Sequence, residues 1–266
     1  MDEVGGLSNL GSSSILAPPR LMPSMPRQGV GDVSSFDDLA DDGEFDAAPE
    51  WYQLAVMVND GSGSMTLEFA EPDDSLEGYG AVRTKAAAVE GALRRLLGDI
   101  RNGHSPQNYH FSFISFNDKV TDQRPPKALG ELSDTDSYDP TANGTGGTAI
   151  HRGLDAAAQI VKAYLEFAAA SELPVSAAVV VMSDGEERDD PARTAASAER
   201  LRGLPNTTVA ACLFGTKGQP SIGKPLLESI VSSRELFQEV YNAEELRRFF
   251  RKSVTATRPR LPPGSR

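Results

Sequence analysis

The chain contains an apolar run, Leu54-Ala55-Val56-Met57-Val58, which is followed two residues later by Asp60-Gly61-Ser62-Gly63-Ser64. An apolar run of this length with β-branched residues, stopped by glycine, is typical of a central parallel strand that helices cover on both faces. In open α/β sheets, ligands bind beyond the carboxyl ends of the strands. The two segments therefore predict an α/β sheet whose edge carries a carboxylate and two hydroxyls.

Two later segments bring further side-chain oxygens to the same predicted edge. Thr148 ends the glycine-rich loop 144–148 ahead of a helical pattern, and Asp184 follows a second apolar run, residues 177–182, with Ser183 between them. Carboxylates and hydroxyls suit magnesium, manganese or calcium, and they suit zinc or copper poorly. Because the chain has one cysteine and three histidines, a site for a softer metal is not expected.

These three motifs, in this order, resemble the metal-ion-dependent adhesion site of von Willebrand factor type A domains. The resemblance implies that Asp60, Ser62, Ser64, Thr148 and Asp184 are the metal ligands. It also implies that the site binds one divalent cation, with magnesium as the first choice and manganese or calcium as alternatives. A partner protein would then complete the ion's coordination with an Asp or Glu. Each motif alone is more often a simple turn, but three together favour a metal site.

A narrower resemblance concerns the end of the domain. The segments 212–215, 244–250 and 253–254 are similar to those of bacterial cytosolic, tellurite-resistance TerY-type A domains. This similarity implies a role in a stress-response or signalling assembly, beside an AAA-type ATPase, a kinase or a phosphatase. The chain departs from the family pattern at Asn59 and in the long connection 66–83. That connection adds five acidic residues near the predicted site, Glu68, Glu71, Asp73, Asp74 and Glu77, and could cover the site or alter its specificity.

The expected domain spans residues 51–256 and has a Rossmann-like, doubly wound, mainly parallel sheet flanked by helices. Periodicity predicts strands at 54–58, 109–116, 176–182, 207–214 and 236–241, with a short edge strand and loop in 121–139. It predicts helices at 84–100, 150–170, 191–201, 222–231 and 243–254. Strands that alternate with helices favour a mainly parallel sheet.

The two ends of the chain have a different composition. Residues 1–50 contain ten acidic and two basic residues, a net charge of −8 within the whole chain's −12, together with four prolines in residues 18–26. Such a segment cannot bury much apolar area, so we expect a disordered acidic leader. Residues 257–266 are expected to be a loose tail. The acidic balance opposes nucleic-acid binding.

The sequence offers no support for a membrane or secretory segment. It opens with Met1-Asp2-Glu3 rather than with a basic and apolar stretch. Cys212 lies inside an apolar run and is expected to be a buried small hydrophobe rather than a redox group. These observations predict a cytoplasmic location.

Other readings of the same residues lead to different functions. Gly61-Ser62-Gly63 resembles a dinucleotide fingerprint, but Thr66 stands where a third small residue belongs. Metal-assisted phosphoester hydrolysis by Asp60 and Asp184 is an alternative, although no general base is evident. A metal-independent scaffold is another. Because no general base is evident, we expect a non-enzymatic protein.

The three histidines, His104, His110 and His151, are expected to be structural or exposed. Asn117-Asp118 is expected to form a turn.

Overall fold

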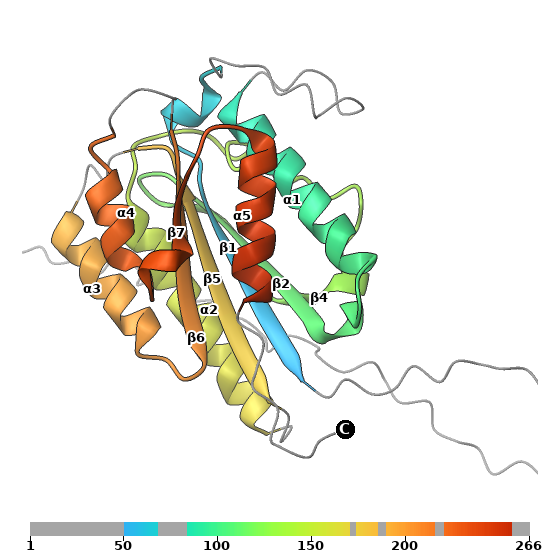
Figure 1. The fold of residues 1–266 in the computed structure, drawn as a ribbon. Coiled ribbons are helices and arrows are strands. Elements are labelled where there is room, and N and C mark those ends of the chain that lie inside the picture. Colours follow the sequence, from blue (N-terminus) through green and yellow to red (C-terminus); the bar gives the residue numbers. More distant parts are fainter. Residues whose placement is uncertain (1–50, 69–83, 171–173, 186–189, 216–220, 257–266) are drawn as a thin grey trace, which may run out of the picture.

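Strand β1 (Tyr52–Asp60) lies inside a mainly parallel sheet (Figure 1). The computed structural model describes residues 51–68, 84–170, 174–185, 190–215 and 221–256. Within these residues the sheet has seven strands, six of them in the order β3-β2-β1-β5-β6-β7, and β4 pairs with β2. Their bounds are β2 (Tyr109–Phe116), β3 (Val120–Gln123), β4 (Lys127–Ala128), β5 (Val175–Ser183), β6 (Thr207–Phe214) and β7 (Phe237–Val240). Strands β3 and β4 run antiparallel to β2, and all other pairings are parallel.

Helices cover both faces of this sheet. Helices α1 (Lys85–Arg101) and α5 (Ala243–Thr255) lie side by side on one face, in front of the sheet in Figure 1. Helices α2 (Ile150–Ala169), α3 (Pro191–Arg202) and α4 (Lys224–Ile230) cover the other face. The described residues also contain four short 3-10 helices: η1 (Gly63–Thr66), η3 (Pro106–Asn108), η4 (Leu129–Glu131) and η5 (Arg234–Leu236).

The alternation of side chains along β1 explains the two hydrophobic cores. Ala55 and Met57 contact the α1 and α5 layer, whereas Leu54, Val56 and Val58 contact the layer of α2, α3 and α4. All five side chains are fully buried. Successive residues of a strand point to opposite faces, so a strand that is apolar throughout can be buried on both sides. The expected doubly wound α/β fold is confirmed.

The predicted elements agree closely with the observed ones. Strands β2 and β6 have the expected bounds, and β1 is longer than expected, since it includes Asp60 itself. The region 121–139 contains two short antiparallel strands and η4 rather than one edge strand. Helix α4 begins at Lys224, two residues later than expected, after a Gly223 N-cap, and Ile222 is exposed.

Several expectations fall partly or wholly outside the described residues. The acidic leader 1–50, the tail 257–266 and residues 69–83 of the long connection belong to this group. None of the helices in the described parts of the chain is long and apolar enough to cross a membrane. Cys212 is a free, buried thiol, as expected, and burial raises its pKa well above the ordinary value.

His110 is buried in β2 and has a structural role. Its Nδ1 lies 3.0 Å from the hydroxyl of Tyr164, and its ring meets that of Tyr52 edge to face. Desolvation lowers the pKa of His110 to about 4, so this imidazole is neutral at pH 7. His151 is also buried, whereas His104 is exposed, in agreement with the expectation for both.

Candidate metal-binding site

The neighbouring strands β1 and β5 bring the two predicted aspartates to one edge of the sheet. These strands pair in parallel with Asn59 opposite Met182, so Asp60 follows on one strand while Ser183 and Asp184 follow on the other. Asp60 is the last residue of β1 and is fully buried, and the side chain of Asp184 is 1% exposed. Both carboxylates are thus positioned by the register of the sheet, close to its carboxyl edge.

Hydrogen bonds connect four of the five predicted ligands. The backbone N–H of Ser62 donates to Asp60 Oδ1 at 2.8 Å, which closes a tight turn after the strand. The hydroxyls of Ser62 and Ser64 lie 3.0 Å apart, and the hydroxyl of Ser64 donates to Asp184 Oδ1 at 2.7 Å. Asp60, Ser62, Ser64 and Asp184 therefore form one continuous chain of polar groups across two loops.

Ser183 supports the buried carboxylate of Asp60. Its hydroxyl donates to Asp60 Oδ2 at 2.6 Å, so each oxygen of this carboxylate accepts a hydrogen bond. Desolvation raises the pKa of Asp60 to about 6, the hydrogen bonds from Ser183 and Ser62 oppose that rise, and the nearby charge of Asp184 adds to it. A nearby cation would stabilise the ionised form of such a buried carboxylate, because it would compensate the negative charge that burial disfavours.

Thr148 lies in a loop whose backbone is hydrogen-bonded to the first loop of the site. The N–H of Gly63 donates to the carbonyl of Gly146 at 3.1 Å, which joins the first loop to the third. Thr148 follows two residues later and is buried. No hydrogen bond links its side chain to the other four predicted ligands within the described residues. The structure therefore places this loop at the site without showing Thr148 in contact with the cluster.

Two glycines allow these loops to approach each other. A Cβ atom at Gly61 would lie 2.3 Å from the carbonyl oxygen of Pro140, and one at Gly146 would lie 2.4 Å from Asp118 Oδ1. The expected turn at Asn117 is present, since its side-chain oxygen accepts from Lys119 N at 3.0 Å. The same residue also holds the Thr148 loop, because its backbone oxygen accepts from Ala149 N at 2.8 Å.

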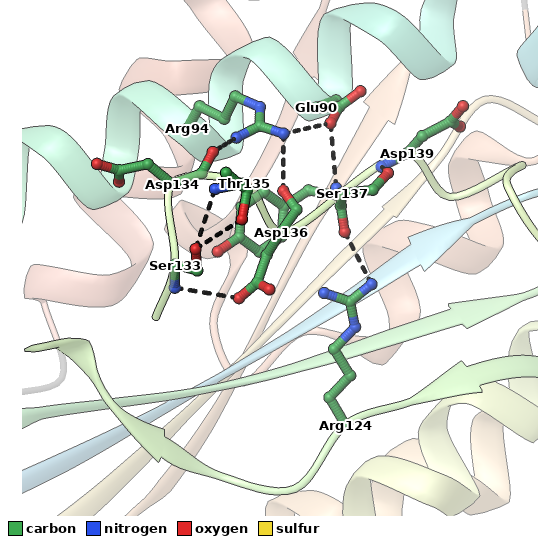
Figure 2. Close-up of polar contacts among 10 residues, drawn as sticks. Glu90, Arg94, Arg124, Ser133, Asp134, Thr135, Asp136, Ser137 and Asp139 are labelled. Atoms are coloured by element: carbon green, nitrogen blue, oxygen red, sulfur yellow. Dashed lines mark hydrogen bonds and ion pairs between the residues drawn. The ribbon is translucent and has the colours of Figure 1, made fainter. Parts of the chain in front are cut away.

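Arginines fix the segment that leads to Pro140 (Figure 2). Arg94 on α1 donates to the carbonyl oxygens of Asp134 and Asp136, at 2.6 and 2.7 Å, and to Glu90 at 2.8 Å. The guanidinium carbons of Arg94 and Arg124 lie 5.4 and 5.8 Å from the centroid of the Tyr138 ring. Positively charged groups over an aromatic face are attracted by the ring quadrupole. The segment is therefore attached to α1 just before Pro140, the residue whose carbonyl group packs against Gly61.

Lys85 is the residue of this site that the sequence reasoning missed. Its ammonium lies 2.5 Å from Asp184 Oδ2, and its side chain is 12% exposed. Lys85 is the first residue of α1, where the helix dipole disfavours a positive charge. No local sequence pattern identifies Lys85, because its contact with Asp184 joins residues 99 positions apart.

The donor set fits a hard divalent cation. The predicted ligands offer two carboxylates and three hydroxyls, and Mg²⁺ commonly takes one or two carboxylates and keeps several waters. Among the described residues, no group of three or more His, Cys, Asp or Glu side chains is arranged to hold a metal. Any ion held here would therefore rely on hydroxyls and water beside the two aspartates.

The comparisons with known proteins concern the fold. No family model and no curated protein matches the sequence. The open conformation of the pilus adhesin SpaC from Lactobacillus rhamnosus GG is a similar solved structure, with a TM-score of 0.55 and 14% identity over 78% of this chain. This chain covers 30% of that adhesin. At this level of identity the likeness concerns the fold alone.

Two further solved structures have lower TM-scores. A von Willebrand factor type A protein from Catenulispora acidiphila has a TM-score of 0.47 and 19% identity, over 77% of this chain and 43% of its own. Proximal thread matrix protein 1 from the mussel byssus, with a zinc-occupied MIDAS motif, has a TM-score of 0.48 and 19% identity. That match covers 79% of this chain and 48% of the matrix protein.

Proposed function

We propose that this chain is a protein-interaction module that binds one divalent cation at Asp60, Ser62, Ser64, Thr148 and Asp184. The observation that carries the proposal is the continuous set of contacts from Asp60 through Ser62 and Ser64 to Asp184, which joins two loops at the carboxyl edge of the sheet. Magnesium is the first choice of ion, and manganese or calcium are alternatives, because all donors are oxygens.

The bound ion would supply an electrophilic position at which a carboxylate of a partner protein can complete the coordination. This chain contributes the geometry: the sheet register fixes both aspartates, and the Ser62 turn directs its hydroxyl toward Ser64. Two aspartates roughly balance the charge of a divalent ion, so an additional Asp or Glu can bind.

The cellular setting is part of the proposal and rests on the TerY-type resemblance. We place the protein in the cytoplasm, in a bacterial stress-response or signalling assembly, with an AAA-type ATPase, a kinase or a phosphatase as the candidate partner. The similarity to a pilus adhesin supports a role in binding rather than catalysis. We therefore propose a non-enzymatic protein, with no role for nucleic acid or membrane binding.

Calorimetric titration of chelator-treated protein with Mg²⁺, Mn²⁺ and Ca²⁺ tests the proposal. Wild type should bind one ion, and Asp60→Asn should bind none, because an amide cannot replace the buried carboxylate as an anionic ligand. Asp155→Asn is the control, since Asp155 pairs with Arg200 on the α2 and α3 layer away from the site. Circular dichroism checks that each variant is folded. Equal ion binding by wild type and Asp60→Asn would refute the proposed ligands.

A further inference from the structure

The Lys85 ammonium binds one of the predicted metal ligands, the carboxylate of Asp184. Asp184 accepts from the hydroxyl of Ser64 through Oδ1 and from the ammonium of Lys85 through Oδ2, at 2.7 and 2.5 Å. Both of its oxygens are therefore engaged. The pair is shielded from solvent, with exposed fractions of 12% for the lysine side chain and 1% for the aspartate. Lys85 thus neutralises Asp184 from within the chain.

The backbone ties this lysine to the first loop of the site. Lys85 is the first residue of α1, and its N–H donates to the carbonyl of Leu67 at 3.2 Å. Leu67 in turn closes η1, the turn that contains Ser64. The start of α1 is thereby held beside the site, and the flexible lysine stem carries the ammonium the remaining way to Asp184.

Local energetics alone do not favour an ammonium at this place. The amino end of a helix carries a partial positive charge, and removing an ammonium from water is costly unless it gains a charged partner. Here the carboxylate of Asp184 is that charged partner. The same carboxylate would attract a divalent ion at the predicted site.

We propose that the Lys85 ammonium is an internal competitor of the divalent ion: it holds Asp184 in the metal-free protein and leaves that carboxylate when the ion binds. This inference rests on the proposed function, since it concerns the same site. Exchange of one cation for another keeps the buried carboxylate compensated at every stage. The competition also sets the ion concentration at which the site fills, and Lys85 is therefore a determinant of affinity rather than a ligand.

Removal of the ammonium should tighten ion binding. Lys85→Met keeps most of the stem and loses the charge, Lys85→Arg keeps the charge, and Lys162→Met is a control at an exposed lysine of α2. In calorimetric titration with Mn²⁺, Lys85→Met should bind about tenfold or more tightly than wild type, because the ion no longer displaces an ion pair. Lys85→Arg and Lys162→Met should not show this gain.

Stability without metal gives a second measurement. In chelator, Lys85→Met should unfold at a lower temperature than wild type, because Asp184 is left buried without its cation, and Mn²⁺ should raise its Tm more than it raises that of wild type. A third measurement is acylation of lysines followed by mass spectrometry. Modification of Lys85 should increase when Mn²⁺ is added to wild type, whereas modification of Lys162 should not change.

The possible outcomes separate this inference from the proposed function. Equal or weaker Mn²⁺ binding by Lys85→Met would overturn the competition while leaving the metal site in place. Unchanged acylation of Lys85 upon Mn²⁺ binding would overturn it as well. If neither wild type nor folded Lys85→Met binds any ion, the proposed metal site itself fails, and the inference fails with it.

Discussion

Ser183 and Asp60 are joined across strands β5 and β1 by a hydrogen bond of 2.6 Å from hydroxyl to carboxylate. The bond lies in the interior, where Ser183 and Asp60 are both 0% exposed. A buried carboxylate that loses such a donor retains its desolvation penalty. This contact therefore links the candidate site to the stability of the sheet.

Ser183→Ala should lower the free energy of unfolding by about 1–3 kcal/mol, because Asp60 Oδ2 loses its donor. Ser176→Ala, in the same strand, is the matched control: the buried hydroxyl of Ser176 has no hydrogen-bond partner among the described residues. That control should be close to neutral. Denaturant unfolding of both variants at pH 7 measures the difference, and equal losses would contradict the assigned role of Ser183.

Gly61→Ala should destabilise the protein by a few kcal/mol, since the new Cβ would lie 2.3 Å from the Pro140 carbonyl oxygen and both backbones would have to move. Gly98→Ala in α1 meets no atom within 4 Å and should stabilise by up to about 1 kcal/mol through higher helix propensity. Thermal unfolding of the two variants gives opposite shifts in Tm. A neutral result for Gly61→Ala would show that this loop yields more easily than its packing implies.

The stability of the protein should depend on pH through His110. Its native pKa of about 4 lies below the ordinary value of 6.5, so the unfolded state binds the proton first as the pH falls. The contribution of His110 to the free energy of unfolding should thus decrease between about pH 6.5 and 4, by roughly 3 kcal/mol at most. Asp60, whose pKa is raised from 3.8 to about 6, contributes in the opposite direction between about pH 6 and 3.8, so the two contributions partly cancel in the wild type.

A comparison with His110→Asn isolates the histidine contribution, because Asp60 is common to both proteins and the Asn side chain can still reach Tyr164. Denaturant unfolding at pH 7, 6 and 5 should give a difference between wild type and variant that shrinks as the pH falls. Parallel stability curves would argue against a buried, neutral imidazole.

Arg94→Ala should loosen the segment from residue 134 to 138, since the variant loses the bonds to two carbonyl oxygens and the contact with Tyr138. We expect a loss of about 1–3 kcal/mol and faster cleavage of this segment in limited proteolysis. Arg248→Ala is the control, because Arg248 is 67% exposed and its pairing with Glu244 is worth little. Identical cleavage rates in the two variants would contradict the role of Arg94.

The sequence was sufficient to predict the strands and helices because their signals are local. The all-apolar run before Asp60 and the alanine-rich pattern after Thr148 each specify one kind of element, and the structure has both. The edge region 121–139 was less predictable, since its strands are only four and two residues long. Whether such short segments form strands depends on the neighbouring strand they pair with, because they are too short to show a periodic pattern.

The candidate site was predicted in part for a similar reason. Asp60, Ser62 and Ser64 are neighbours in sequence, and the parallel pairing of β1 with β5 brings Asp184 beside them. Lys85 lies 99 residues from Asp184 in sequence, and their contact depends on where helix α1 begins in space. No local pattern encodes that distance. The position of Thr148 likewise depends on the path of a loop.

The pairing of β1 with β5 has a consequence for how this protein can change during evolution. A slip of one residue between the strands would shift one carboxylate by about 3.3 Å along the strand and turn the apolar side chains to the opposite face. The same residues of β1 and β5 thus determine the spacing of the two aspartates and the packing of both cores. Substitutions that preserve the interior also preserve this spacing, so evolution can alter binding through those loop positions that are neither proposed ligands nor tightly packed like Gly61.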